Sequence, residues 1–246
     1  MAHIQIVADD IELDSPTLVE GLPGAGLVGK IAADHLADEF DMTYYGALHC
    51  DGIPRVAVYE GDSSALRPPV RLYADESMDL LVLRSDVPVS PTQVTEFASC
   101  VTGWLDANDV FPVYLSGLAE EKAGTPELYG VATGDGDARL DAAGVVPPRD
   151  GGMVSGPTGA LLHRAVETGL DSVGLIVQTD PRFPDPEAAR TVLEHGVGPI
   201  ADIDVDTDRL VEKAGEIQDA REQLAKRLQE MDQDGSTQAQ PIRGFQ

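Results

Sequence analysis

The sequence of 246 residues predicts an α/β protein, a three-layer α/β/α sandwich around a mixed, largely parallel sheet, with a long C-terminal helix. Three observations lead to this prediction. Short apolar runs alternate with segments of helical periodicity, as expected where strands and helices alternate along a chain. Several runs, such as residues 173–177, are apolar throughout, which is typical of strands buried on both faces. Hydrophobic residues make up 42% of the chain. This is a globular composition, and a chain of this length can form a full core without disulfides or bound metals.

The apolar runs predict strands at residues 17–22, 42–48, 55–59, 70–73, 79–83, 110–115, 129–132 and 173–177. Helical patterns lie between them, at residues 27–40, 94–105, 158–168 and 187–195. Three of these helices follow a proline, at Pro91, Pro157 and Pro186, and proline in the first turn is typical of a helix N-terminus. Strands and helices therefore alternate over most of the chain.

The C-terminal region has a different pattern. Apolar residues recur four, three and four residues apart from Leu210 to Met231, which is heptad spacing interrupted by Arg221. We expect an α/β/α domain at residues 1–206, an amphipathic helix at 207–232 and a flexible tail at 233–246. The helix either packs on its own domain or is shared between subunits, and the residues that would form the shared seam are Leu210, Ala214, Ile217, Leu224 and Leu228.

The charge is strongly negative, with 43 acidic against 17 basic residues and a formal net charge of -26. Such a field repels phosphate backbones, so we expect no nucleic-acid partner. The acidic residues are spread along the chain, which suggests adaptation to concentrated salt, where the Debye length is roughly 3 Å. We therefore expect the protein to come from an extreme halophile.

The sequence offers no targeting or membrane signal. The N-terminus is acidic, unlike a secretory signal, and no apolar run approaches the roughly 18 to 20 residues of a membrane span. The two cysteines, Cys50 and Cys100, imply no disulfide framework, and Cys100 is interpreted as a small buried side chain in a helix. We therefore expect a cytoplasmic protein without membrane contact.

A glycine-rich loop is the clearest motif. Gly24, Gly26 and Gly29 match G-x-G-x-x-G between a strand and a helix, and with Lys30 the same loop matches the start of a phosphate loop. Ile31 stands where a phosphate loop has a hydroxyl for Mg²⁺, which argues against nucleotide hydrolysis. Two interpretations stay open: a tight turn that lets the helix approach the sheet, and a site for an anion or nucleotide.

Other candidate chemistry is sparse. Gly156, Thr158 and Gly159 open a helix whose amides could bind an anion. The histidines show no metal-ligand spacing, and no G-x-S-x-G nucleophile elbow occurs. We expect no metal, no cofactor and no catalytic residues.

Three segments carry a family resemblance: residues 20–36 (EGLPGAGLVGKIAADHL), 156–162 (GPTGALL) and 184–189 (PDPEAA). They resemble the archaeal and bacterial proteasome assembly chaperone family, the family of the second eukaryotic proteasome assembly chaperone. The resemblance implies a sandwich similar to nucleoside phosphorylases, a homo-oligomer and no catalysis. It also implies proteasome α-subunits, or the assembled 20S particle, as partners.

The C-terminus departs from the family pattern. Family members that act on proteasomes end in a hydrophobic residue, a tyrosine and any residue, whereas this chain ends in Gly244, Phe245 and Gln246 after Ile242. We interpret the end either as a degenerate docking tail or as an inert terminus. The sequence therefore predicts a non-catalytic proteasome chaperone or adaptor. The alternative is a small-molecule or nucleotide-binding enzyme or sensor that uses the loop from Gly24 to Lys30.

Overall fold

A computed structural model of the protein describes residues 3–59, 64–120, 124–210 and 212. One sheet of eight strands forms its middle layer, in the order β1-β3-β6-β7-β2-β8-β10-β9. Its strands are β1 (Ile4–Ile6), β2 (Thr17–Gly21), β3 (Thr43–Leu48), β6 (Val70–Asp75), β7 (Leu80–Ser85), β8 (Phe111–Ala119), β9 (Leu128–Thr133) and β10 (Ser172–Thr179). A separate two-stranded ribbon pairs β4 (Val58–Tyr59) with β5 (Leu66–Arg67).

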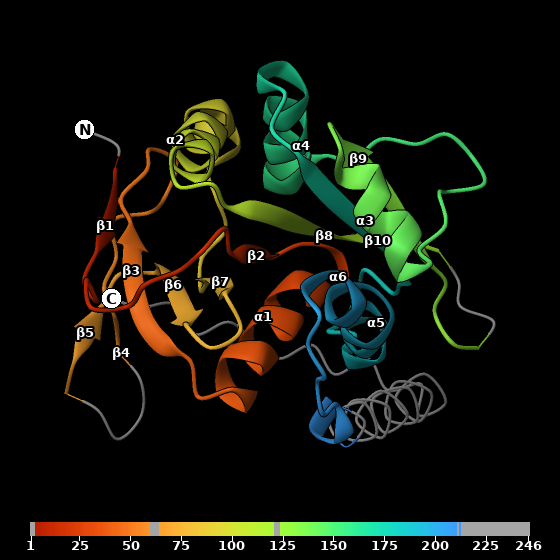
Figure 1. The fold of residues 1–246 in the computed structure, drawn as a ribbon, viewed down its shortest axis with the longest axis horizontal. Coiled ribbons are helices and arrows are strands. Elements are labelled where there is room, and N and C mark those ends of the chain that lie inside the picture. The colour runs from red at the N-terminus through yellow and green to blue at the C-terminus, as the bar shows by residue number, and fades with distance from the viewer. Residues whose placement is uncertain (1–2, 60–63, 121–123, 211, 213–246) are drawn as a thin grey trace, which may run out of the picture.

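Helices cover both faces of the sheet (Figure 1). On one face lie α2 (Val94–Ala107) and α4 (Gly156–Thr168), and on the other lie α1 (Val28–Glu39), α3 (Gly136–Ala143), α5 (Pro186–Val192) and α6 (Gly198–Ala201). Short 3₁₀ turns precede α1 and α2, at Ala25–Leu27 and Pro91–Gln93, and a π-helical segment, Leu193–Val197, joins α5 to α6. The predicted α/β fold with helical layers on a mixed sheet is confirmed, while the expected likeness to nucleoside phosphorylases stays a prediction.

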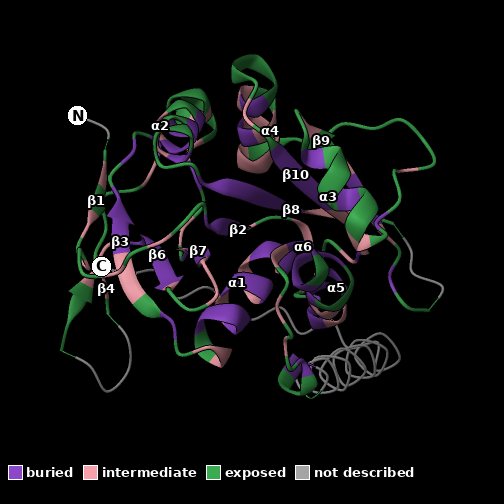
Figure 2. Ribbon diagram, in the orientation of Figure 1, coloured by how far each residue is buried: buried purple, intermediate pink, exposed green. Residues whose placement is uncertain are grey.

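The sheet is parallel at its centre and antiparallel at its edges. Strands β7, β2, β8 and β10 pair in parallel, whereas β1, β3 and β6 at one side and β9 at the other pair antiparallel with their neighbours. The central strands are buried over most of their length, as apolar runs such as residues 173–177 predict, and Figure 2 shows this burial. Each face of the sheet contributes to its own apolar core, one beneath α1 and α5 and one beneath α2 and α4.

The elements that sequence patterning missed are short or barely amphipathic. Helix α3 buries only Gly136 and Leu140, so its sequence carries almost no helical periodicity. Strands β1 and β5 have three and two residues, too few for an alternating pattern. The strand expected at 55–59 begins only at Val58, and the helix expected at 187–195 continues as π and α turns to Ala201.

The beginning of the C-terminal region packs on the chain itself. Leu210 is buried in the same core as α1 and α5, and the His35 ring of α1 lies 2.6 Å from the Asp206 carbonyl through its Nε2. Ala214, Ile217, Leu224 and Leu228, and the tail residues Ile242, Gly244, Phe245 and Gln246, lie outside the described residues. The predicted helix at 207–232 and the tail at 233–246 therefore stay predictions.

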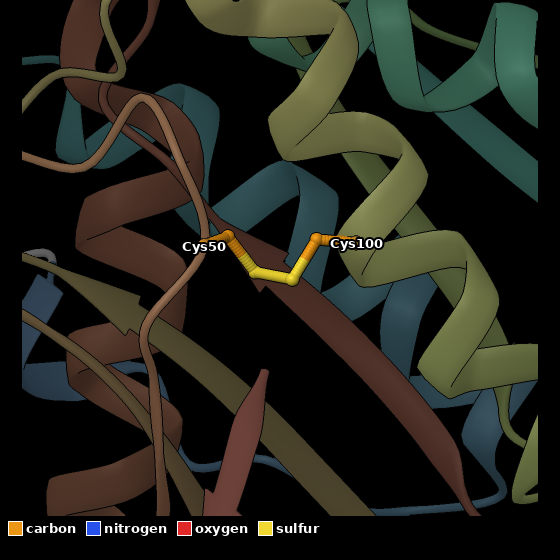
Figure 3. The surroundings of a disulfide bond; sticks show 2 residues. All are labelled: Cys50 and Cys100. Atoms are coloured by element: carbon orange, nitrogen blue, oxygen red, sulfur yellow. A yellow bond between two sulfur atoms is a disulfide. The ribbon is translucent and has the colours of Figure 1, made fainter. Parts of the chain in front are cut away.

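The two cysteines form a disulfide, so the expectation of unpaired thiols is wrong (Figure 3). Cys50 follows β3 and Cys100 lies in α2, and their Cα atoms are 5.9 Å apart, within the range that a disulfide requires. The two residues are 50 positions apart in the sequence, and only the packing of α2 beside the end of β3 brings them together. Among the described residues, each helix is too short or too polar to cross a bilayer.

Candidate functional site

The glycine loop connects β2 to α1 and packs against the end of β10. Gly26 has a φ of 62°, and a Cβ atom there would lie 2.0 Å from Thr179 Oγ1. Its carbonyl accepts a hydrogen bond of 2.8 Å from the backbone N–H of Asp185, the residue that caps α5. The loop therefore needs glycine at this position to reach β10 and α5.

Neighbouring glycines let α1 approach the sheet. A Cβ atom on Gly21 would lie 2.2 Å from the Cβ of Ala33, and one on Gly29 would lie 3.2 Å from the carbonyl oxygen of Leu22. Gly24 is different, because no described atom lies within 4 Å of the place where its Cβ would be. Most of the motif is thus accounted for by close packing of helix on strand.

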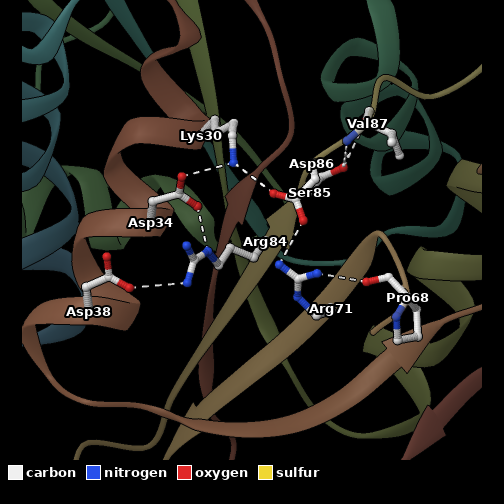
Figure 4. Close-up of polar contacts among 9 residues, drawn as sticks. All are labelled: Lys30, Asp34, Asp38, Pro68, Arg71, Arg84, Ser85, Asp86 and Val87. Atoms are coloured by element: carbon white, nitrogen blue, oxygen red, sulfur yellow. Dashed lines mark hydrogen bonds and ion pairs between the residues drawn. The ribbon is translucent and has the colours of Figure 1, made fainter. Parts of the chain in front are cut away.

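Lys30 lies in a charged network instead of facing an open loop (Figure 4). Its Nζ is 2.9 Å from Asp34 Oδ2 and 3.3 Å from Asp86 Oδ1. Arg84 extends the network, 2.7 Å from Asp34 and 3.2 Å from Asp38. Two carboxylates already compensate the positive charge of Lys30. A lysine that binds phosphate would need that charge for its ligand.

Sequence reasoning missed the buried arginine of this network. Arg71 on β6 is 1% exposed, its Nη2 is 2.8 Å from Asp86 Oδ2, and its Nη1 donates to the Pro68 carbonyl at 2.9 Å. The signal was present, because an arginine stands inside the apolar run from Val70 to Tyr73. Its partner Asp86 lies beyond β7, so the pairing depends on the sheet register.

Glu20 joins the two motifs that the sequence singled out. This fully buried carboxylate on β2 accepts hydrogen bonds from the Leu22 N–H at 2.8 Å and from the Leu115 N–H at 3.1 Å. The Thr158 hydroxyl at the start of α4 donates to it at 3.2 Å. Glu20 therefore links the segment that leads into the glycine loop, through Leu22, to the start of α4, through Thr158.

The role of Glu20 was not predicted, although a charged residue in the otherwise apolar run at 17–22 was a visible signal. Burial raises the pKa of Glu20 to about 7, and the hydrogen bonds from Leu115, Leu22 and Thr158 oppose this rise. The helix start itself is a tight turn, because Gly156 has a φ of 71° and a Cβ on Gly159 would lie 2.3 Å from the Val154 carbonyl oxygen. The site is thus a packed junction around a carboxyl group that changes charge near neutral pH.

Replacing Glu20 tests this electrostatic description. The pKa of Glu20 in the folded protein lies above the ordinary value of 4.5. Burying the neutral carboxyl group therefore contributes its full stability below pH 4.5, and this contribution is lost as the pH rises to about 7. The Glu20→Gln variant does not titrate there. Its free energy of unfolding relative to the native protein is expected to rise across this window, by on the order of 3 kcal/mol.

Urea unfolding at a series of pH values measures the difference. Thr158→Val is the companion variant, because it removes one hydrogen bond that favours the charged form and should move the window to higher pH. A difference between native protein and Glu20→Gln that is flat from pH 4.5 to 7 would contradict a strongly raised pKa.

Comparison with known proteins gives the family. The sequence model of the PAC2 family matches residues 18–225, which is most of the chain. The chain belongs to the PAC2 family. It is also 30% identical over 217 residues to the uncharacterized protein MJ0106 of Methanocaldococcus jannaschii, covering 87% of each chain.

Solved structures agree with this membership. The crystal structure of Pyrococcus furiosus PbaA, described as an archaeal homologue of proteasome-assembly chaperone, has a TM-score of 0.77 and 26% identity to this PAC2 protein, covering 95% of each chain. Pyrococcus furiosus PbaB, described as an archaeal proteasome activator, has a TM-score of 0.75 at 23% identity and covers 92% of this chain and all of PbaB. At 23% identity, the similarity to PbaB shows that the two chains share a fold and carries no conclusion about function.

Among the described residues, no group of three His, Cys, Asp or Glu side chains is placed to hold a metal ion. Glu20 is the described group whose pKa moves closest to neutrality, but it is fully buried and faces backbone amides and Thr158. What the arrangement can do is fix α1 and α4 against the sheet.

Nucleotide binding tests whether the glycine loop is structural. Titration calorimetry with ATP, GTP and NAD is expected to show no binding tighter than about 0.1 mM, or roughly 5.5 kcal/mol, because Lys30 is paired and Gly26 faces Thr179. Micromolar binding that Lys30→Ala abolishes and Lys30→Arg retains would contradict this interpretation.

Proposed function

We propose that this PAC2 protein is a non-catalytic chaperone or adaptor of the proteasome that acts as a homo-oligomer. The observation that carries the proposal is the similarity to PbaA over nearly the whole of both chains, at 26% identity and a TM-score of 0.77. The proposed partners are proteasome α-subunits or the assembled 20S particle, together with further copies of this chain. Nucleic acid is not among the proposed partners, because 17 basic residues beside 43 acidic ones offer few cationic contacts to phosphate groups, and no membrane partner is proposed.

The packed glycine loop supports an adaptor over a small-molecule enzyme or sensor. Gly26 contacts Thr179, Lys30 is paired with two carboxylates, and Thr158 donates to Glu20. The two side-chain groups that an anion would use, the Lys30 ammonium and the Thr158 hydroxyl, already have partners within the chain. An anion would have to displace those partners to bind either group.

The proposed setting is the cytoplasm of an extreme halophile, and this proposal rests on the charge alone, because the Cys50–Cys100 disulfide withdraws the support that the cysteines gave it. The excess of 43 acidic over 17 basic residues suits concentrated salt, in which self-repulsion is screened over about 3 Å. Apolar contacts between copies gain strength under the same conditions if the salt is excluded from the protein surface. Binding assays therefore belong in molar KCl.

Deleting Gly244 to Gln246 tests the tail. If Phe245 enters an apolar groove on the proteasome, the deletion is expected to abolish co-purification with α-subunits, while the oligomer keeps its size. One phenylalanine is worth about 1.5 to 3 kcal/mol, so tails on several subunits have to act together.

A variant that restores the family pattern tests docking by the tail in the opposite direction. Gly244→Leu/Phe245→Tyr restores the hydrophobic residue and the tyrosine of the family pattern, and it should increase the recovered α-subunits. Co-purification that neither the deletion nor the double variant changes would place recognition on the folded domain and contradict docking by the tail.

A further inference from the structure

Residues 50–57 follow β3 and are joined to α2 by the Cys50–Cys100 disulfide (Figure 3). Cys50 is buried in the core beneath α2, whereas the second half of the segment is exposed. Within the part of the chain that the structure describes, one backbone hydrogen bond joins this segment to another: the Ser90 N–H donates to the Gly52 carbonyl at 2.8 Å. The disulfide is therefore the covalent anchor of a segment with few other ties.

The same segment forms a wall of a half-open pocket of about 890 Å³. Every residue from 48 to 57 lines this pocket, and the opposite lining includes His3, Arg67 and Gln93. The pocket keeps its shape only while residues 50–57 stay in place. The bond that holds them thus also holds the pocket.

The surroundings of the disulfide are partly open and cationic. Cys50 lines the pocket, and Cys100 on α2 is half-buried. The pocket lining contains the guanidinium groups of Arg55 and Arg67 against one carboxylate, Asp51, although the chain as a whole has a net charge of -26. Cationic and partly exposed surroundings are typical of cysteines that exchange, whereas cysteines enclosed in an apolar core are inert.

We propose that the Cys50–Cys100 disulfide is a reversible redox clamp. Oxidation fixes residues 50–57 on α2, and reduction by a dithiol releases them and opens this wall of the pocket. The fold persists on reduction, because β3 and α2 also pack on the sheet through other side chains, such as Leu48 and Phe97. The clamp is independent of the proposed role at the proteasome.

The reaction is a thiol–disulfide exchange. A thiolate of the dithiol attacks one sulfur atom of the Cys50–Cys100 bond, which forms a mixed disulfide and expels the other sulfur as a thiolate. The second thiol of the reductant then breaks the mixed disulfide. Two electrons pass from the dithiol to the protein, the two protons that the dithiol loses end on Cys50 and Cys100, and the reductant leaves as a cyclic disulfide.

Cleavage by an arginine-specific protease in molar KCl tests the clamp. The site after Arg55 lies within residues 50–57, and the site after Arg149 lies in the exposed loop before α4 and serves as an internal reference. The ratio of cleavage after Arg55 to cleavage after Arg149 is expected to rise at least about tenfold on reduction, because the released segment can adopt the extended conformation that a protease requires. Reoxidation should restore the original ratio.

Two variants control the measurement. Cys50→Ala/Cys100→Ala lacks the clamp and should show the high ratio with and without the dithiol. Ser99→Ala changes an exposed neighbour on α2 and keeps the bond, so it should respond to the dithiol as the native chain does. The reduced native chain carries the test even if the double variant fails to fold.

Two results would overturn the clamp. A cleavage ratio that reduction leaves unchanged would show either that other contacts hold residues 50–57 or that the whole chain unfolds. A rate of reduction that levels off, at high dithiol concentration, at the rate of global unfolding would show that the bond opens only in the unfolded chain. Reduction of the folded protein at a rate that stays proportional to dithiol concentration is the result expected of a clamp.

Discussion

Gly26→Ala is expected to destabilise the fold by about 3 kcal/mol or more, the largest effect of any single methyl group in the glycine loop. The backbone there has a φ of 62°, which costs a residue with a Cβ roughly 1 to 2 kcal/mol. The new methyl would also lie 2.0 Å from Thr179 Oγ1, a fully buried atom that donates to Asp185. Overpacking at such a place typically adds about 1 to 3 kcal/mol, because Thr179 cannot move without losing its hydrogen bond.

Gly24→Ala is the matched control in the same motif. Gly24 has an extended backbone, and no described atom lies within 4 Å of its Cβ position, so this variant should change stability by less than about 0.5 kcal/mol. Urea unfolding in molar KCl measures both variants. A Gly26→Ala protein as stable as Gly24→Ala would contradict the description of the loop as a packed turn.

Reduction of the Cys50–Cys100 disulfide is expected to lower the free energy of unfolding by about 2 to 4 kcal/mol. The bond joins residues 50 positions apart, and a loop of this length restricts the unfolded chain considerably. It also ties the segment after β3 to α2, next to the pocket that Cys50 helps to line. Unfolding curves with and without a dithiol reductant measure the loss.

The double variant Cys50→Ala/Cys100→Ala supplies the control. It should unfold at about the denaturant concentration of the reduced native protein and show no further response to the reductant. Equal stability of the oxidised and reduced native protein would mean that the bond does not restrain the chain. A response of the double variant to the reductant would show that the reductant acts elsewhere.

Local patterning predicted the centre of this fold because its signals are local. Strands β7 and β10 contain apolar runs, Leu80–Leu83 and Val173–Val177, and the glycine at the end of β2 marks the turn into α1. At the edges the signal fails, since β1 and β5 are very short and α3 buries little.

The site could be predicted only in part, because its contacts join residues that are distant in sequence. The sequence singled out Lys30 and Thr158, but the partners that define their roles lie 56 residues away at Asp86 and 138 residues away at Glu20. The disulfide was missed for the same reason. Knowing which strands are neighbours is what turns a candidate anion loop into a packed junction.

Binding to the proteasome is the role proposed for this PAC2 protein, and affinity capture measures that binding directly. The tagged full chain is captured from a native lysate of its source cells in molar KCl, and bound proteins are identified and quantified by mass spectrometry against an untagged control. We expect proteasome α-subunits to be enriched over the control, and the same capture with Gly244 to Gln246 deleted then shows whether the tail carries this recognition. Capture of further copies of this chain with no proteasome subunit above the control would contradict the proposed role.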